Sequence, residues 1–401
     1  MAKPPRAALP AGIWVLGGVS LLMDVSSEMI HSLLPLFMVG TLGVSVLWVG
    51  LIEGLAEATA LMIKVFSGAL SDWLGRRKGL ALAGYALGAL SKPLFAMAGG
   101  LGMLVTARLI DRVGKGIRGA PRDALVADLA PPDQRGAAFG LRQSLDTGGA
   151  FAGPLIGAGL MLLWANDFRA VFWVAVIPAV AAVALLWWGI QEPARPALPA
   201  GEQRRNPISR AAMRQLSPAY WWVVSIGGLF TLARFSEAFL VLRAEQTGIA
   251  LAAVPLMLVA MNAVYALSAY PFGRLADSWS HRRLLVLGLA TLIAADLVLA
   301  SSSHWVGVLA GMLLWGLHMG MTQGLLATMV VDTAPASLRG TAFGLFNLFS
   351  GVALLLASLL AGLLWDQMGA AWTFWIGAVF CALTIAALCL RRPPAAAGDV
   401  E

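Results

Sequence analysis

Ionisable side chains recur inside long apolar segments of this sequence, at spacings that place them on single helix faces. In the segment near 12–39, Asp24, Glu28 and His31 stand at positions i, i+4 and i+7. These spacings align side chains along one face of a helix. Two carboxylates and an imidazole arranged in this way can take up and release protons, or they can pair with cations on neighbouring helices.

Two further segments have the same character. Near 46–72, Glu53 and Glu57 stand one turn apart, with Lys64 further along the same face. Near 102–129, a basic stripe falls at positions i, i+4, i+7 and i+14, and its members are Arg108, Arg112, Lys115 and Arg122. A charge at bilayer depth costs several kcal/mol unless it is paired or faces water, so each of these residues is a candidate for function.

Two interpretations of these charges stay open. They can form a structural lattice of salt bridges, or they can form a proton relay beside an anion-binding site. The two are compatible, because a relay needs ion pairs that can break. The candidates for proton coupling are Asp24, Glu28, Glu53, Glu57, Arg112 and Glu237. The candidates for substrate binding are His31, Arg108, Lys115, Arg118, Arg122, Arg234, Asn262, His318 and Gln323.

Neither a metal nor a cofactor is expected. No cluster of histidine and cysteine surrounds His31 or His318 in the sequence, and histidine binds zinc in proteins mostly as part of such a cluster. Cys381 and Cys389 stand on one predicted helix, roughly 12 Å apart by helical rise, which is too far for a disulfide. The sequence also lacks a phosphate-binding loop that could use ATP.

The composition decides which elements hold these residues. The 401 residues are 59% hydrophobic and 12% charged, with a mean hydropathy of +0.79. Soluble domains are about one quarter charged, so the composition predicts an all-α polytopic membrane protein. We expect the N-terminal apolar segment to be retained as the first helix rather than removed as a signal.

Twelve apolar segments are long enough to cross a bilayer, six in each half. They lie near 12–39, 46–72, 79–99, 102–129, 136–164 and 168–190, and near 219–245, 250–276, 283–302, 305–331, 340–364 and 371–390. The stretch 191–217, rich in Pro and Arg, is the expected linker. The sequence therefore predicts two six-helix bundles, at 1–190 and 218–401, joined by this linker.

An internal repeat supports the division into halves. The run from Gly68 to Lys78 recurs 205 residues later, from Gly273 to Arg283. A repeat of this size is half a protein, and two similar membrane halves indicate an alternating-access transporter. We expect each run to be a gate, because its carboxylate can pair with nearby arginines in one state and release them in the other. The gating candidates are Gly68, Asp72, Gly75, Arg76, Arg77, Gly273, Asp277 and Arg282.

A glycine motif marks the segment near 136–164. Glycines at four-residue spacing let helix backbones approach closely, and a proline bends the helix. The members of the motif are Gly149, Gly153, Pro154 and Gly157.

These motifs resemble those of the major facilitator superfamily. The run from Gly68 to Lys78 is similar to the family's loop between helices 2 and 3, and the glycine motif resembles one associated with antiporters. Arg112-x-x-Lys115-Gly116 partly matches the helix 4 motif, whose arginine is linked to proton transfer, although Lys115 and Arg118 depart from it. The resemblance implies the twelve-helix fold of two pseudo-symmetric bundles. It extends to a poorly characterised prokaryotic subgroup, through motifs such as Asp24-V-S-S-Glu28.

The resemblance and the charges together predict a secondary transporter of the inner membrane, not an enzyme. The first hypothesis is a proton-coupled antiporter that exports a small molecule. The alternative is proton-coupled import of an anionic metabolite or metal chelate. A membrane-embedded enzyme that uses the face of Asp24, Glu28 and His31 is a third possibility, and the repeat counts against it. The expected partners are a small-molecule substrate, protons and the lipid bilayer, with no nucleic acid, and the protein is expected to be a monomer.

The basic residues predict the orientation in the membrane. Loops on the side of the N-terminus carry 17 Lys and Arg residues, whereas those on the opposite side carry only Arg169 and Arg243. Positive loops stay cytoplasmic, so both termini and the linker 191–217 should be cytoplasmic. A cysteine placed in the linker should react with an impermeant maleimide only after the inner face is opened. Labelling in intact cells would contradict the predicted topology.

Overall fold

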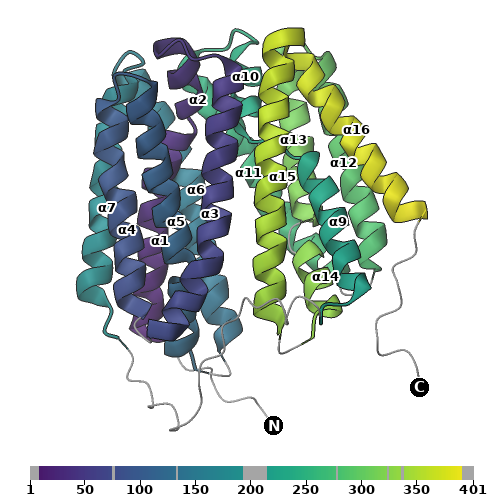
Figure 1. The fold of residues 1–401 in the computed structure, drawn as a ribbon. Helices are drawn as coiled ribbons and strands as arrows, with labels where there is room; N and C mark the ends of the chain where they lie inside the picture. The colour runs from purple at the N-terminus through teal and green to yellow at the C-terminus, as the bar shows by residue number, and fades with distance from the viewer. Residues whose placement is uncertain are drawn as a thin grey trace, which may run out of the picture.

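The computed structural model describes residues 9–74, 77–131, 134–192, 215–276, 279–322, 325–335 and 338–390. Within these ranges the regular structure is helical, and the long helices run roughly side by side between two faces of the molecule (Figure 1). We call the face at which α1 begins and α16 ends the terminal face, which is the lower one in Figure 1. The other is the far face.

The first half forms six spans. The first span is built from one long helix and two short pieces, and the other five are single helices. In chain order they are α1 (Ala11–His31) with α2 (Leu34–Leu36) and the π-helical turn η1 (Phe37–Thr41), α3 (Val46–Leu74), α4 (Arg77–Met97), α5 (Leu101–Leu129), α6 (Arg135–Leu163) and α7 (Phe168–Gly189).

The second half repeats this order. Its spans are α9 (Pro218–Leu232) with α10 (Ala238–Glu245), the 3₁₀ turn η2 (Leu251–Ala253) with α11 (Val254–Ala276), α12 (His281–Ser301), α13 (Trp305–Thr322) with α14 (Leu325–Thr333), α15 (Arg339–Met368) and α16 (Ala370–Leu390). The domain boundaries around 191–217 stay a prediction, since residues 193–214 lie outside the described ranges.

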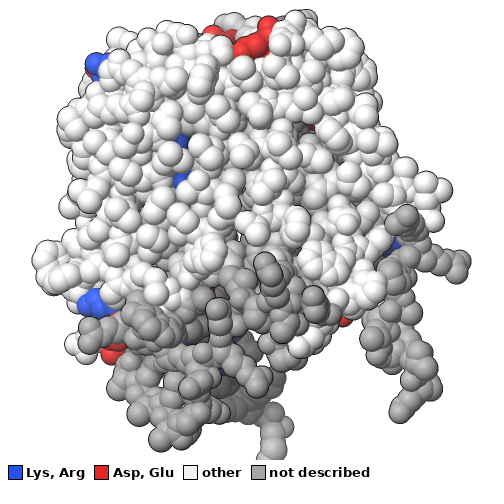
Figure 2. Space-filling model, in the orientation of Figure 1, with Lys and Arg blue, Asp and Glu red and all other residues white. Residues whose placement is uncertain are grey.

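Apolar surface wraps the bundle. In the described ranges, ten helical stretches are long and apolar enough to cross a membrane. The two other spans are α5, which carries the basic stripe, and the interrupted pair α9 and α10. Figure 2 shows a face almost free of charge across its middle, and tryptophans such as Trp188 lie exposed on the outside. The protein is a multi-pass membrane protein, and the predicted all-helical, twelve-span fold is confirmed.

One predicted helix is interrupted. The segment expected as continuous over 219–245 breaks at residues 233–237, between α9 and α10. The Ser236 N–H donates to Ser358 Oγ at 3.2 Å, and the Ala238 N–H donates to Ser236 Oγ at 3.3 Å. Irregular backbone at membrane depth needs such acceptors. No residue pattern predicts this break, because neither proline nor glycine occurs between Ala233 and Glu237.

The first span is interrupted at the corresponding place of the other half. After α1, the chain turns at Ser32 and Leu33 before α2 begins. Pro35 occupies the start of α2, where its missing N–H is tolerated. The interruptions therefore occur in the first span of each half.

The two halves meet along two helix pairs. In front in Figure 1, α3 and α15 lie against each other, and α6 contacts α11 behind them. The α3–α15 contact runs the length of both helices: a Cβ on Gly362 would lie 2.8 Å from Leu47 Cα near the far face, and one on Gly344 would lie 2.8 Å from Val65 Cγ1 near the terminal face. We call this contact the α3–α15 seam.

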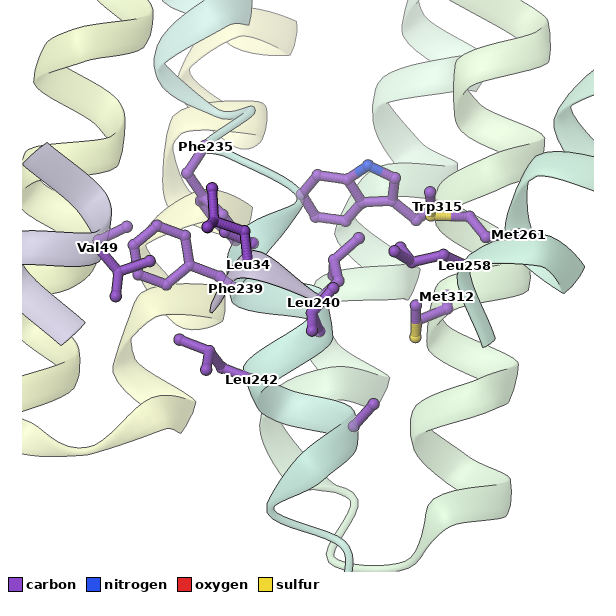
Figure 3. Packing of buried hydrophobic residues seen from close by; sticks show 14 of the residues in the cluster. Leu34, Val49, Phe235, Phe239, Leu240, Leu242, Leu258, Met261, Met312 and Trp315 are labelled. Atoms are coloured by element: carbon purple, nitrogen blue, oxygen red, sulfur yellow. The ribbon is translucent and has the colours of Figure 1, made fainter. Parts of the chain in front are cut away.

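A cluster of buried apolar residues joins the halves in the far-face part of the molecule. It includes Leu34 and Val49 of the first half and Phe239 and Leu240 of the second, and all four side chains are fully buried. Figure 3 shows Leu34 and Val49 beside Phe239, with Trp315 and Met312 of α13 nearby. Close packing of these side chains holds the halves together at this level, since helices in a membrane associate largely through van der Waals contact.

One polar contact also joins the halves at the far face. Asp366 of α15 accepts hydrogen bonds from the N–H groups of Val46 at 3.1 Å and Leu47 at 2.9 Å, at the start of α3. A carboxylate at a helix N-terminus is favoured by the helix dipole. Asp167 makes the same kind of cap on α7, with the N–H groups of Arg169 and Ala170, but within one half.

Asp366→Ala should therefore loosen the far-face contact, whereas Asp167→Ala should not. Each loss of a cap costs about 0.5–2 kcal/mol, so both variants should melt at a lower temperature. Only Asp366→Ala should also increase the labelling of a cysteine placed in the central cavity, measured with an impermeant reagent added at the far face. Equal labelling in both variants would contradict a role for Asp366 between the halves.

Candidate functional site

A central cavity of about 630 Å³ lies between the two halves. This volume is within the usual range of small-molecule sites. The first half lines it from α1, α3 and α5, and the second half lines it mainly from α9, α10, α13, α15 and the break at 233–237. The lining charged and imidazole side chains are Glu28, His31, Glu53, Glu57, Arg108, Arg112, Lys115, Arg234 and Glu237.

Both interrupted spans reach this cavity. Ser32 and Pro35 line it at the break after α1, and Arg234 and Glu237 line it at the break after α9. Interrupted helices at equivalent places of two repeats are typical of transporter binding sites, because their free backbone groups and side chains face the substrate.

Arg112 is the centre of the ionic wall. Its side chain is only 2% exposed, and Nη1 lies 2.9 Å from Glu57 Oε1. Nη2 lies 3.0 Å from His31 Nδ1, and Nε lies 3.7 Å from Asp111 Oδ2. Helices α1, α3 and α5 therefore all contribute to the environment of one guanidinium.

Two more ion pairs flank Arg112. Arg108 binds Glu53 between α5 and α3. Behind the cavity, Lys92 of α4 is fully buried, with Nζ 2.7 Å from Asp111 Oδ1 and 3.1 Å from Ser27 Oγ. These contacts supply the opposite charges that a buried cation requires.

Three charged residues face the cavity without such a partner. Among the described residues, no ion pair within 4.0 Å involves Lys115, Arg234 or Glu237. Lys115 is exposed to the cavity, and the Arg234 guanidinium lies 5.7 Å from the ring centre of Phe230. These groups are free to meet a ligand.

The wall from the second half carries aromatic side chains. Phe230, Phe235, Trp315 and Phe346 line the cavity opposite the ionic wall. Phe235 packs against Trp315, with ring centres 5.3 Å apart. Most of the cavity's charged groups thus come from the first half, and its aromatic rings come from the second.

Some predicted site residues lie elsewhere. Arg118 is 4% exposed and stacks on Tyr85 of α4, with the guanidinium 4.9 Å from the ring centre. Arg122 and Asp24 lie in a cluster nearer the terminal face, and Asn262 lines a second cavity. His318 is fully buried behind Phe230 and contacts the Gly288 carbonyl oxygen at 2.8 Å. Gln323 lies outside the described residues.

The sequence prediction missed Asp111 and Asp146 as site residues. Asp111 joins Lys92, His31 and Arg112, and Asp146 lies beside Arg122 and Arg142. The signal was present, since a carboxylate at bilayer depth is as costly as a cation. Among the described residues, no group of three His, Cys, Asp or Glu side chains is placed to hold a metal ion.

Only part of the predicted gates can be described. Gly75, Arg76 and Asp277 lie outside the described residues, as does the side chain of Asp72. Arg77 binds Asp128 of α5 at 2.6 Å. In the second copy, Arg282 donates to the Cys389 carbonyl oxygen at 3.2 Å, while Gly68 and Gly273 lie on α3 and α11.

The glycine motif brings α6 against α1. A Cβ on Gly149 would lie 2.6 Å from the Leu21 carbonyl oxygen, and one on Gly153 would lie 2.7 Å from Glu28 Cβ. Gly157 faces Met29 one turn further, and Pro154 lies inside the helix. Any larger side chain at the first two positions would push the helices apart.

Comparisons with known proteins agree with this architecture. A profile of the Major Facilitator Superfamily matches residues 16–242 and 233–401. An uncharacterised MFS-type transporter of Methanocaldococcus jannaschii is 29% identical over 384 residues, which cover 94% of each chain. The multidrug resistance protein MdtH of Yersinia pestis is 28% identical over 268 residues, which cover 66% of this chain and 63% of MdtH.

A solved structure gives the fold independently. The nucleoside transporter NupG superposes with a TM-score of 0.79, covering 94% of this chain and 99% of NupG at 12% identity. At this identity the likeness concerns the fold alone.

The ion pairs make a prediction about stability. Arg112→Ala should destabilise the protein by about 1–3 kcal/mol, because Glu57 loses its charged partner. Adding Glu57→Gln should recover part of the loss, measured by thermal unfolding in detergent. Glu53→Gln is the matched control, since Glu53 pairs with Arg108 instead. Equal recovery by the two glutamine variants would show that the Arg112–Glu57 contact has no energetic importance.

Proposed function

Because the chain belongs to the major facilitator superfamily, we propose that it is a secondary transporter that moves a small molecule through the central cavity by alternating access, driven by protons. One observation carries this proposal: a guanidinium shared by two carboxylates and an imidazole lies directly on the cavity, between Glu57, Asp111 and His31. A purely structural ion pair has no need of an imidazole or of access to water.

The contacts of Arg112 suggest how protons act. Glu57 and Glu28 face the cavity with side chains 31% and 32% exposed, so water in the cavity can reach them. A proton on Glu57 removes its charge and weakens the contact with Arg112. Arg112 is then free to turn toward Glu28 or toward a substrate. Release of the proton restores the pair.

The two walls favour an amphipathic substrate. Phe230, Phe235 and Trp315 offer an apolar surface, and Lys115, Arg234 and Glu237 offer unpaired charges opposite or beside it. Such a combination binds a molecule with an aromatic or apolar body and a polar group. The lining contains both signs of charge, so it supports no choice between an anion and a cation.

Efflux is the direction that we propose. It rests on the glycine motif at Gly149 and Gly153 and on the distant relationship to a protein named for multidrug resistance. Proton-coupled import of an anionic metabolite or metal chelate is the alternative, which the basic stripe of α5 would suit. In either case the terminal face is proposed to be cytoplasmic, in the inner membrane, and the working unit a monomer.

Transport in proteoliposomes tests this function. A pH-sensitive dye inside the vesicles should report proton movement when amphipathic aromatic amines, carboxylates or neutral compounds are added. Arg112→Ala should abolish this movement but still allow the same compound to exchange down its own gradient, because the cavity remains while the coupling contact is lost.

The control is another arginine outside the cavity. Arg243 bonds to the carbonyl oxygens of Leu299 and Ser302 near the far face, and Arg243→Ala should retain coupled transport. Transport by the wild type without any proton movement, for every compound carried, would exclude proton coupling.

A further inference from the structure

A second polar cluster lies between α1, α5 and α6, on the terminal side of the central cavity. Asp24 of α1 and Asp146 of α6 line the same cavity, at the level where α1 packs closely against α6. Arg122 lies 3.1 Å from Asp123 and 3.5 Å from Asp146. Arg142 lies 3.6 Å from Asp146 and 3.9 Å from Asp123. We call these five residues the Asp24–Asp146 cluster.

The charges of this cluster favour one bound proton. Two carboxylates have no hydrogen to share, so a hydrogen bond between Asp24 and Asp146 can form only when one of them is protonated. The cluster holds three carboxyl groups and two guanidinium groups, and one proton makes it neutral. Arg142 is 8% exposed, and its Nε and Nη1 atoms have no hydrogen-bond partner among the described residues. The cluster is thus incompletely satisfied even with Arg142 aimed into it.

Close helix packing creates the carboxyl pair. Gly149 lies one turn beyond Asp146 on α6, and a Cβ there would lie 2.9 Å from Asp24 Cβ. The absence of a side chain at Gly149 lets α1 approach α6 at this level. The glycine motif therefore positions the pair in addition to packing the helices.

The pair opens onto a second cavity of about 560 Å³. Asp24, Asp146 and Thr147 line one side of it, and Asn262 and Tyr265 of α11 line the other. This cavity lies between α6 and α11, and η2, at the far end of α11, packs against α6. The carboxyl pair therefore lies at a junction between the halves.

Other ionisable groups surround the pair at longer range. Lys115 and Arg118 of α5 interact electrostatically with Asp24, and Lys64 of α3 interacts in the same way with Asp123. Tyr85 of α4 lies near Arg122, and Tyr265 is the ionisable group on α11. Helix α7 packs on α1 and has no ionisable residue beyond Arg169. The lysines and Arg118 balance the second negative charge of the pair after water enters the cavity and the proton leaves.

Building on the proton coupling proposed above, we propose that the Asp24–Asp146 pair is a proton-binding site that controls whether α6 and α11 close over the second cavity. Closure would remove water from the pair and bring Asn262 and Tyr265 toward it. A neutral pair tolerates that loss of water, but an additional negative charge does not.

The proton balance of this step is simple. On binding, a hydronium ion in the second cavity gives its proton to one carboxylate oxygen and becomes water, and the new O–H donates to the other carboxylate. On release, the O–H bond breaks and water in the reopened cavity accepts the proton. No oxidant or second reactant takes part.

The distance between α6 and α11 tests the proposal without a substrate or a gradient. Spin labels can be placed at Gly140 and Gly273, where an added Cβ meets no atom within 4 Å. The exposed Cys389 is replaced by Ser, and Cys381 is buried. Labelled protein in lipid nanodiscs should show a shorter distance at low pH and a longer one at high pH. For one proton, the ratio of the two populations changes by at most about tenfold per pH unit.

Variants assign the response to the pair. Asp146→Asn should keep the short distance at every pH, since the amide has no charge to hydrate, and Asp24→Asn is the second variant if the first fails to fold. Asp332→Asn, on α14 outside both cavities, should respond as the parent does.

Two results would overturn the proposal. One is a distance that does not change with pH in the parent protein. The other is a response that survives both asparagine variants but is lost in Glu57→Gln, which would place the proton sensor in the central cavity. Neither result bears on proton-driven flux in proteoliposomes, so the proposed function is judged separately.

Discussion

A guanidinium inside a membrane bundle must find compensation in every direction, and Arg112 shows how strongly this requirement shapes the first half. With 2% of its side chain exposed, it draws Glu57 from α3 and His31 from α1 to one place on α5. Asp111, its neighbour in sequence, is in turn held by Lys92 from α4. Four helices thus meet in one network, in which Glu57 and Asp111 compensate the charge of Arg112 and Lys92 compensates that of Asp111.

The sequence predicts the helix faces well and the contacts between helices poorly. The spacing of Asp24, Glu28 and His31 was enough to place them on one face, but spacing says nothing about which neighbour that face meets. Spacing alone leaves both Glu28 and Glu57 as candidate partners of Arg112, and the structure pairs Arg112 with Glu57 because α3 packs along α5. The break at 233–237 escaped prediction because its acceptor, Ser358, is supplied by α15, far away in the sequence.

The halves share a fold but not an electrostatic character. Helices α4 (Arg77–Met97) and α12 (His281–Ser301) are equal in length and begin 204 residues apart (281 − 77), which makes Asp296 the counterpart of Lys92 (296 − 204). Lys92 has an ionic partner, whereas the two carboxylate oxygens of Asp296 have no hydrogen-bond partner among the described residues. In the central cavity, the second half supplies aromatic rings such as Phe230 and Trp315. The paired charges of the cavity lie in the first half, and the second half supplies the apolar surface.

The α3–α15 seam limits the movements that the halves can make. Two helices that touch near both faces, at Gly362 and at Gly344, cannot separate without losing the whole contact. They can roll about it, as two cylinders do along a common line, with only small shear between side chains. Displacement in a roll grows with distance from the axis, so α6 and α11, behind the cavity, have the longest lever arm. A rotation of a few degrees about the seam would then widen or narrow the gap between α6 and α11, with the seam as the hinge.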